Sequence, residues 1–336
     1  MLVTGGAGYI GSVLTELLLD RGHEVVVLDR FFFGPTLAHL TARRGLSVLK
    51  GDIRWADPRV FEGIDAVCDL AAISNDPAGE LQPDKTMQIN FQGRARLAEA
   101  AKARGVARYV LASSCSIYGF QEGVLDERSK ANPLTTYARA NLEAERANLA
   151  LAAEDFCVTV LRQATVYGLS PRMRFDLAIN GMTLGVFQNA SIPVLRDGSQ
   201  WRPMVHVRDT SRAFTAVLEA EPEAVNGEIF NVGSDDQNFQ ILPLARRVSE
   251  AVGVPFRHEW YGDPDHRSYQ VSFRKVHDAL GYKTELTPED AAQEIFAALE
   301  QGVVKPDIRT RTVEWYKSLI SWHELLEEVV LDDVLL

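Results

Sequence analysis

The stretch Thr4-Gly5-Gly6-Ala7-Gly8-Tyr9-Ile10-Gly11 decides the fold of this chain. It follows a short apolar run at residues 1–3, typical of a buried strand, and leads into residues 10–19 (IGSVLTELLL), whose apolar side chains share one helix stripe. The first of its spaced glycines permits a tight turn, the second lets backbone N–H groups approach a pyrophosphate, and the third lets the helix pack closely. The helix N-terminus adds free N–H donors and a partial positive charge. The pattern indicates a phosphate-binding turn, although three glycines alone also suit an ordinary strand–helix connection.

An acidic residue stands where a dinucleotide-binding unit needs one. The apolar run 24–28 (EVVVL) predicts a second buried strand, and Asp29 follows it, 18 residues after Gly11. At about 20 residues from the glycines, a carboxylate accepts hydrogen bonds from the hydroxyls of the adenosine ribose and repels a 2′-phosphate. Asp29 therefore favours NAD over NADP. The neighbouring Arg30 leaves the alternative open, because an arginine can pair with that phosphate.

The overall composition is that of a globular protein. The chain has 336 residues, 46% apolar and 24% charged, which suits one large domain with a lobe, or two domains. The formal net charge is −11 and Lys and Arg form no cluster, so we expect no nucleic-acid partner. Apolar runs stay shorter than the ~18 residues of a membrane span, so we expect no membrane partner.

The cysteines and the N-terminus indicate a cytoplasmic protein. Cys68, Cys115 and Cys157 are odd in number and lack metal-site spacing, which fits a reducing compartment. The seven histidines also lack ligand spacing, so we expect no metal. Because the first residues already form a strand and its phosphate turn, we expect no signal peptide.

Strands alternate with helices over the first half of the chain. Further buried strands are predicted at residues 46–50, 66–70, 108–113 and 157–162, and long helices at 84–104 and 137–153. This alternation predicts an α/β fold, a doubly wound parallel sheet of the Rossmann type, with ligands at the carboxyl ends of the strands. We place the NAD-binding domain at residues 1–168. Residues 169–336 form mainly a smaller α/β substrate-binding lobe, with some chain returning to the sheet edge.

Together these segments resemble the extended short-chain dehydrogenase/reductase family, in its branch of NAD-dependent nucleotide-sugar epimerases and dehydratases. The matching pieces, in the family's order, are residues 4–11, Asp29, 51–53 (GDI), 70–72 (LAA), 113–119, Tyr137, 161–168 and 201–209. The resemblance implies that NAD lies across the sheet edge and that a nucleotide-diphosphate sugar lies under the second lobe.

The resemblance and the strand ends assign ligand contacts to particular residues. Asp52 is placed to reach the adenine amino group, and the small residues Ala71 and Ala72 leave room for a flat cofactor. The cofactor-binding set is Gly5, Gly8, Tyr9, Ile10, Gly11, Asp29, Arg30, Asp52, Ile53, Leu70, Ala71, Ala72, Asn90, Tyr137, Asn141 and Val166. The substrate-binding set is Ser74, Ser114, Asn180, Arg202 and Arg267. The two arginines suit a diphosphate, because their planar fork gives paired hydrogen bonds.

Family members transfer a hydride with a Ser or Thr, a Tyr, and a Lys four residues after the Tyr. By motif position these are Ser114, Tyr137 and, in place of the lysine, Asn141, which shares a helix face with Tyr137. In the family, tyrosinate removes a proton from a sugar hydroxyl, the serine orients the same oxygen, and the lysine lowers the tyrosine pKa and bonds the nicotinamide ribose. Without the lysine, we expect the pKa of Tyr137 to lie nearer ~10.

Asn141 leaves several functions open. The protein is a slow or specialised enzyme, or it binds cofactor and nucleotide-sugar with lost or altered catalysis, or Asn141 is an inactivating substitution. A one-way NAD-dependent sugar oxidoreductase is a further alternative. Arg139 is expected on another helix face, and Lys130 in the preceding loop stays a candidate cation. Dehydratases place Asp-Glu after the Ser or Thr, whereas Cys115-Ser116 stands here. Cys115 is either an acid–base group or a small filler, and the resemblance favours an epimerase.

The two long helices predict a homodimer. Residues 84–104 and 137–153 carry apolar side chains on more than one face, notably Leu97, Leu142, Ala147 and Leu149. In the resembling family these helices form a four-helix bundle across a two-fold axis, the commonest oligomer symmetry.

Overall fold

Seven parallel strands form the central sheet of the computed structural model, which describes residues 1–263 and 268–331. These strands are β1 (Leu2–Thr4), β2 (Val25–Asp29), β3 (Leu46–Lys50), β4 (Ala66–Asp69), β5 (Arg108–Ser114), β7 (Cys157–Gln163) and β11 (Glu228–Val232). Their order is β11-β7-β5-β4-β1-β2-β3, and all neighbours are parallel. The chain therefore runs from β1 toward one edge through β2 and toward the other through β4. The predicted doubly wound Rossmann sheet is confirmed, and β11 of the second half forms one edge.

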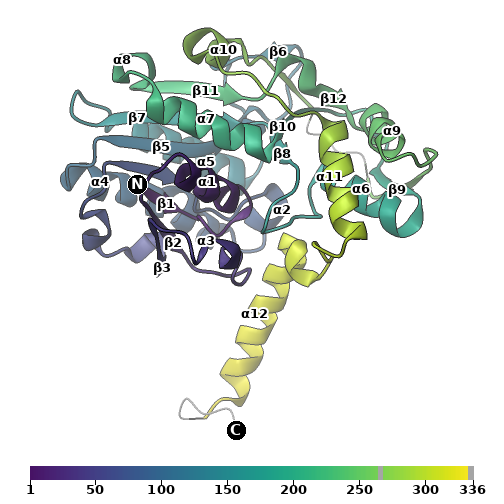
Figure 1. Cartoon of the computed structure of the whole chain (residues 1–336), viewed down its shortest axis with the longest axis horizontal. Coiled ribbons are helices and arrows are strands. Elements are labelled where there is room, and N and C mark those ends of the chain that lie inside the picture. The colour runs from purple at the N-terminus through teal and green to yellow at the C-terminus, as the bar shows by residue number, and fades with distance from the viewer. Residues whose placement is uncertain (264–267, 332–336) are drawn as a thin grey trace.

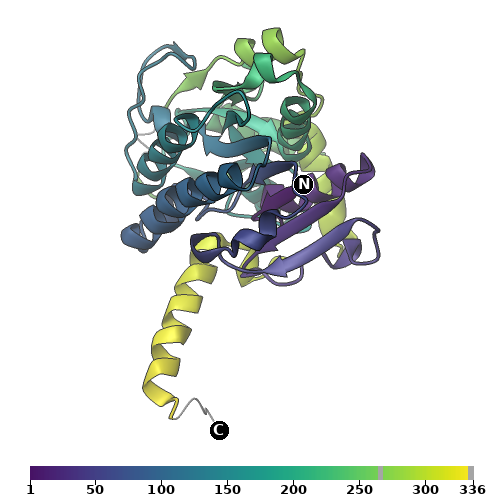
Figure 2. The ribbon, with the colours of Figure 1, turned by 90° about the vertical axis from the view of Figure 1, so that its left-hand side faces the viewer.

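Helices cover both faces of this sheet (Figure 1 and Figure 2). They are α1 (Tyr9–Asp20) and α7 (Val207–Glu219) on one face, and α4 (Arg94–Ala103) and α5 (Thr136–Leu149) on the other. Val3 and Val27 pack into the core cluster under α1 and α7, whereas Leu2 and Leu28 pack into the cluster under α4 and α5. Successive residues of a strand point to opposite faces, so these apolar runs serve two cores at once.

A smaller lobe lies beside the sheet (Figure 1). It holds the sheet β12-β10-β8 and the pair β13-β9, packed with α6, α9 and α11 around a core of their own. The bounds are β8 (Thr165–Tyr167), β9 (Ile192–Leu195), β10 (Trp201–His206), β12 (Asn238–Gln240), β13 (His258–Tyr261), α6 (Ala178–Asn189), α9 (Ile241–Ala251) and α11 (Pro288–Glu300). Shorter elements are α2 (Asp76–Gly79), α3 (Pro83–Met87), β6 (Val124–Leu125), α8 (Pro222–Val225), β14 (Gln270–Val271) and α10 (Arg274–Leu280).

The last helix, α12 (Thr312–Val329), projects away from the body (Figures 1 and 2). Its first turns are anchored: Trp315 Nε1 donates to the Phe32 carbonyl at 2.7 Å, and the Tyr316 ring packs on Phe33. Trp322 and Leu325 lie on the exposed part, about half accessible. Only the beginning of α12 therefore contributes to the body.

The predicted helix at 84–104 is interrupted. The chain forms α3, then a π-helical segment at Gln88–Gly93, and then α4. A π turn holds more residues than an α turn and is frequent at functional sites. Here the side chain of Asn90 bonds the loop after β4 and that of Arg94 bonds strands β4 and β5, and both are buried.

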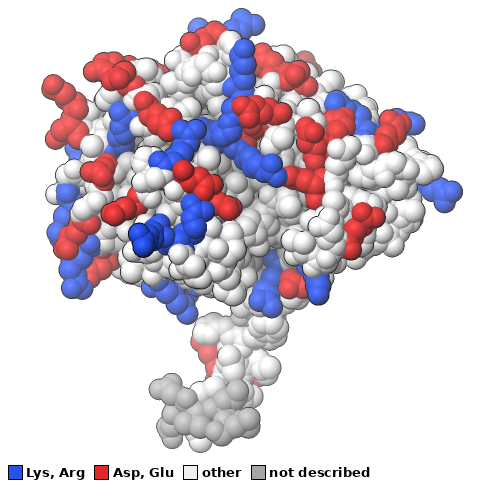
Figure 3. Space-filling view, in the orientation of Figure 1, with Lys and Arg blue, Asp and Glu red and all other residues white. Residues whose placement is uncertain are grey.

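The surface carries mixed charge. On the face shown in Figure 3, basic and acidic side chains are interspersed over the body. Within the described residues, no helix is both long and apolar enough to cross a membrane.

Candidate active site

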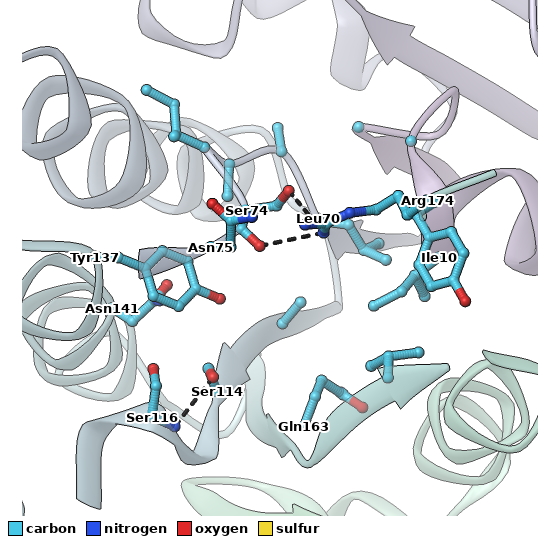
Figure 4. A pocket seen from close by; sticks show the side chains of 18 of the residues that line it. Ile10, Leu70, Ser74, Asn75, Ser114, Ser116, Tyr137, Asn141, Gln163 and Arg174 are labelled. Carbon is cyan, nitrogen blue, oxygen red and sulfur yellow. Dashed lines mark hydrogen bonds between the residues drawn. The ribbon is translucent and has the colours of Figure 1, made fainter. Parts of the chain in front are cut away.

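A cavity of about 440 Å³ opens at the carboxyl ends of the central strands. It lies where β1 separates β2 from β4, which is the topological switch point at which open α/β sheets bind ligands. Its walls come from the glycine turn, the ends of β2, β4 and β5, and the segment 172–178 of the second half. Figure 4 shows Ile10, Leu70, Ser114 and Arg174, which come from four different segments of the chain, around the same space.

The glycine turn is shaped for close approach of other backbone. Gly5 has φ +67°, and a Cβ on it would lie 2.8 Å from the Ala71 amide nitrogen. A Cβ on Gly8 would lie 2.9 Å from the Gly5 carbonyl oxygen, and one on Gly11 would overlap it. Gly8 precedes α1, and no described side chain caps that helix, so its first N–H groups remain available to an anion. The turn therefore fits a pyrophosphate.

Acidic residues line the end of the cavity nearest β2 and β3. The amides of Ala7 and Phe31 donate to Asp29 at 3.0 and 2.7 Å, while burial raises the pKa of this carboxyl. Arg30 donates to Asp52 at 2.8 Å. Burial opposes ionisation of Asp52, but hydrogen bonds from Arg54 and Arg30 outweigh it and lower its pKa to about 2. An anionic Asp52 thus holds Arg30, while Asp29 keeps lone pairs for the hydroxyls of a ribose.

Two buried arginines, which the sequence analysis assigned to no site, line the cavity from the second half. Arg174 pairs with Asp176 at 2.8 Å and donates to the Ser74 hydroxyl at 3.2 Å (Figure 4). Arg172 lies 3.6 Å above the centre of the Phe33 ring and donates to Thr312 Oγ1 at 2.9 Å. No carboxylate among the described residues forms an ion pair with Arg172. Burial, with the Arg174 charge, lowers the pKa of Arg172 to about 9. It is a cation suited to an anionic ligand.

Tyr137 and Ser114 face the cavity from α5 and from the end of β5 (Figure 4). The Ser116 amide donates to Ser114 Oγ at 3.1 Å and so fixes the hydroxyl beside the phenol. Burial raises the pKa of Tyr137, as does the nearby Asp76, while Ser114, Arg94 and Asn141 act in the opposite direction. The expectation of a pKa near its ordinary value thus needs correction upward, because it left out burial.

Asn141 is buried on the same face of α5 as Tyr137 (Figure 4). Its Oδ1 accepts a hydrogen bond from Arg94 Nη1 at 3.1 Å, and its Nδ2 has no hydrogen-bond partner among the described residues. Arg94 is paired with the equally buried Asp69 at 3.0 Å. The other candidate cations are elsewhere: Arg139 is exposed and donates to Thr136, and Lys130 is exposed outside the cavity lining.

Most of the other predicted residues line the cavity. They are Gly5, Gly8, Tyr9, Ile10, Gly11, Asp29, Arg30, Asp52, Ile53, Leu70, Ala71, Ala72, Ser74, Val166 and Arg202. Tyr9 also has a second task, because its hydroxyl donates to the Gly168 carbonyl at 2.6 Å and ties the glycine turn to the second half.

Three predicted residues are placed outside the cavity lining. The Asn90 amide bonds both backbone groups of Ile73, at 2.8 and 2.9 Å, and so holds the loop after β4 instead of facing the cavity. Asn180 donates to Tyr9 Oη at 3.0 Å and to the Arg174 carbonyl at 2.9 Å, so it supports residues that line the site. The thiol of Cys115 is buried behind the site.

Burial also raises the pKa of the Cys115 thiol, whose Sγ donates to the Arg162 carbonyl at 3.3 Å. This makes Cys115 a filler in its present position. Arg267, the second predicted diphosphate ligand, lies outside the described residues. Of the described residues, no three His, Cys, Asp or Glu side chains are grouped as a metal site would require.

Residues 1–233 match the NAD dependent epimerase/dehydratase family. The chain belongs to this family. Membership confirms the resemblance found in the sequence and the prediction of NAD as the cofactor. The glycine turn, the Asp29 carboxylate and the Nδ2 of Asn141, which has no hydrogen-bond partner in the part of the chain that the structure describes, fit a dinucleotide with two ribose groups.

The names of individual relatives refer to nucleotide-sugars but to different reactions. A Bacillus subtilis (strain 168) protein described as the uncharacterized UDP-glucose epimerase YtcB is 32% identical over 293 residues, 82% of this chain and 90% of that protein. The UDP-N-acetyl-alpha-D-glucosaminuronate decarboxylase of Bacillus cytotoxicus is 30% identical over 274 residues, 76% of this chain and 83% of that protein. The solved structure of MoeE5 in complex with UDP-glucuronic acid and NAD is 28% identical, with a TM-score of 0.79, and covers 90% of this chain and 99% of that one.

Proposed function

We propose that this chain is an NAD-dependent nucleotide-sugar epimerase. The observation that carries the proposal is the arrangement of Tyr137 and Ser114 on one wall of a cavity whose other wall is the glycine turn. Dehydration by the family's acidic pair is disfavoured, because Cys115 and Ser116 occupy its positions and the Cys115 thiol is turned away from the cavity.

In this proposal the side chains handle the proton and the orientation of the sugar. Ser114 holds the hydroxyl of the reacting carbon, and Tyr137 takes its proton and later returns it. When bound, NAD supplies the chemistry of accepting a hydride and giving it back. Between the two hydride transfers the sugar must turn so that its other face meets the nicotinamide. The cavity must therefore hold the nucleotide part of the substrate firmly and the sugar loosely.

Arg202 is the proposed ligand for the diphosphate. It lies on β10 of the smaller lobe, lines the cavity, and has its guanidinium 5.6 Å from the centre of the Tyr269 ring. An arginine in this position brings a planar fork to the substrate from the smaller lobe. The nucleotide would thus be held by the lobe while the sugar extends toward Tyr137.

Incubation with UDP-glucose and UDP-glucuronic acid, followed by nuclear magnetic resonance of the products, tests the proposed reaction. Inversion at one sugar carbon is the expected result. Loss of water or of carbon dioxide would show a dehydratase or a decarboxylase instead. Tyr137→Phe serves as the control, because it removes the base and keeps the ring.

A second candidate is a protein that binds NAD and a nucleotide-sugar without turning the sugar over. Two observations favour it: Asn141 replaces the family's lysine, and burial raises the pKa of Tyr137. A sugar carrying deuterium at the reacting carbon separates the candidates. Exchange or inversion identifies an enzyme, whereas saturable binding with the label untouched identifies a binder.

We also propose a homodimer that works in a reducing cytoplasm, where the three buried, unpaired cysteines would stay reduced. The apolar side chains that suggested the dimer are partly used within the protomer. Leu97 is 2% exposed in the protomer's own core, and Leu142 and Leu149 pack against core clusters. The proposal therefore rests on the family resemblance, and light scattering showing a monomer at micromolar concentration would overturn it.

A further inference from the structure

The environment of Asn141 suggests how the site works without its lysine. Its Oδ1 faces Arg94, and arginine can only donate, so the amide orientation is determined by its neighbour. The Nδ2 group must then point away from Arg94, and it is buried, lines the cavity and lacks a partner among the described residues. A buried donor without a partner is rare and costly, so it indicates a place for a ligand group.

The Arg94 guanidinium is held in one orientation. Nη2 donates to the carbonyl oxygens of Asp69 and Ala112 at 2.8 and 2.6 Å, and Nε donates to the Asp69 carboxylate. The Asp69 charge therefore lies on the Nε side, while Nη1 points toward Asn141. The buried pair presents its positive end to the active site, although its net charge is zero.

Asp69 is itself saturated on the far side from the cavity. Thr4 Oγ1 donates to its Oδ1 and Tyr109 Oη donates to its Oδ2, at 2.5 and 2.8 Å. Tyr109 shares Oδ2 with Arg94 Nε, and Thr4 bonds the other carboxylate oxygen, Oδ1. These bonds explain why so large a charged pair is tolerated under the sheet, because every oxygen of Asp69 has a partner.

We propose that Arg94 and Asn141 together take over the work of the missing lysine. Arg94 is a positioning residue that supplies the positive charge and orients the amide, and Asn141 presents its Nδ2 donor to the phenolic oxygen of Tyr137 and to the nicotinamide ribose. This inference rests on the proposed function, because it gives the pair a part in ionising the base of that reaction.

The arrangement predicts that a lysine at position 141 helps only when Arg94 is gone. With Arg94 present, Asn141→Lys places a second cation next to the guanidinium in a buried site, where like charges oppose each other. In the uncharged background made by Arg94→Gln with Asp69→Asn, the same lysine meets no cation. The effect of Asn141→Lys should therefore change sign between the two backgrounds.

Three quantities are measured for each variant: the ionisation of Tyr137, the NAD affinity by calorimetry, and the pH profile of hydride transfer. The ionisation is read from ultraviolet difference spectra, with Tyr137→Phe in the same background as the reference. The uncharged background should raise the apparent pKa of Tyr137 by about one unit, equivalent to about tenfold in tyrosinate at neutral pH. In the uncharged background, Asn141→Lys should lower the apparent pKa of Tyr137 again. In the protein that keeps Arg94, the same substitution should weaken NAD binding and lower the unfolding temperature. A lysine that improves all readouts beside Arg94 would overturn the proposal.

A second variant covers the case in which the uncharged background does not fold. Asn141→Leu leaves the Arg94–Asp69 pair intact and should raise the Tyr137 pKa and weaken NAD binding about tenfold. Unchanged values for both would also overturn the proposal. The matched control is Arg162→Gln with Glu145→Gln, another buried ion pair, whose side chains form no hydrogen bond or ion pair with the side chains of Asn141 and Tyr137 among the described residues. It should leave the Tyr137 ionisation unchanged.

The proposed function and this inference fail separately. If the wild-type protein moves no hydride with any nucleotide-sugar, the proposed function is lost. The Tyr137 ionisation and the NAD affinity still decide whether Arg94 and Asn141 act as a pair, because neither measurement needs a sugar to react.

Discussion

The guanidinium of Arg30 donates to the Asp52 carboxylate at 2.8 Å, across the carboxyl ends of β2 and β3. Arg30 follows Asp29 in the chain and was the candidate ligand for a 2′-phosphate; the ion pair holds its guanidinium at Asp52. The charge expected beside the adenosine ribose is therefore that of the Asp29 carboxylate.

The first prediction concerns the choice of cofactor. NAD should bind more tightly than NADP, by about tenfold or more, because Asp29 meets the 2′-phosphate with like charge. Asp52→Asn should narrow the difference by releasing Arg30. Calorimetric titration of both cofactors measures this, with Asp57→Asn, which breaks an exposed ion pair outside the cavity, as the control. Equal or tighter binding of NADP by the wild type would contradict it.

The second prediction concerns Arg172. Arg172→Leu should weaken NAD binding about tenfold or more, because it removes a buried cation that a pyrophosphate would neutralise and hydrogen-bond. Thermal unfolding without cofactor should change far less, since the variant also removes the cost of burying the charge. Arg246→Leu is the matched control, because Arg246 also lies over a phenylalanine ring but outside the cavity. An equal loss of NAD affinity in Arg172→Leu and Arg246→Leu would contradict a direct contact between Arg172 and the cofactor.

The third prediction is a pH dependence. Burial, the largest influence, raises the pKa of Tyr137, so only a small fraction is ionised at neutral pH. The rate of single-turnover hydride transfer should therefore rise with pH, by about tenfold per unit through the neutral range. Tyr137→Phe should remove both the activity and its pH dependence. A wild-type rate that is flat between neutral and mildly alkaline pH would exclude the Tyr137 proton as the limiting one.

The fourth prediction separates Cys115 from the chemistry. Its thiol is buried, donates to the Arg162 carbonyl and has a raised pKa. Cys115→Ala should leave the rate within about threefold of the wild type, whereas Ser114→Ala should lower it by about a hundredfold or more. The pair of single-turnover rates is the measurement. A large loss in Cys115→Ala, with an unchanged unfolding temperature, would restore the cysteine as an acid–base candidate.

The sequence by itself determined the sheet, the glycine turn and the candidate reacting pair, Ser114 and Tyr137. The glycines at 5, 8 and 11 and the carboxylate at 29 lie at short, defined intervals around one strand–helix connection, so local geometry brings them together. Apolar runs and their periods identified the six strands that the first half contributes to the central sheet, because alternating elements leave few ways to bury their apolar faces. Tyr137 was found through its place in a family motif.

Only the tertiary structure decided what surrounds that motif. Arg94 is 47 residues from Asn141 and meets it because the π-helical turn before α4 directs the guanidinium into the sheet. Arg172 reaches the cavity because the segment after β8 returns across the glycine turn, and Cys115 points away because its strand end turns into a 3₁₀ helix. Side-chain direction at such irregular turns depends on distant packing partners, and no local period or spacing in the sequence encodes them.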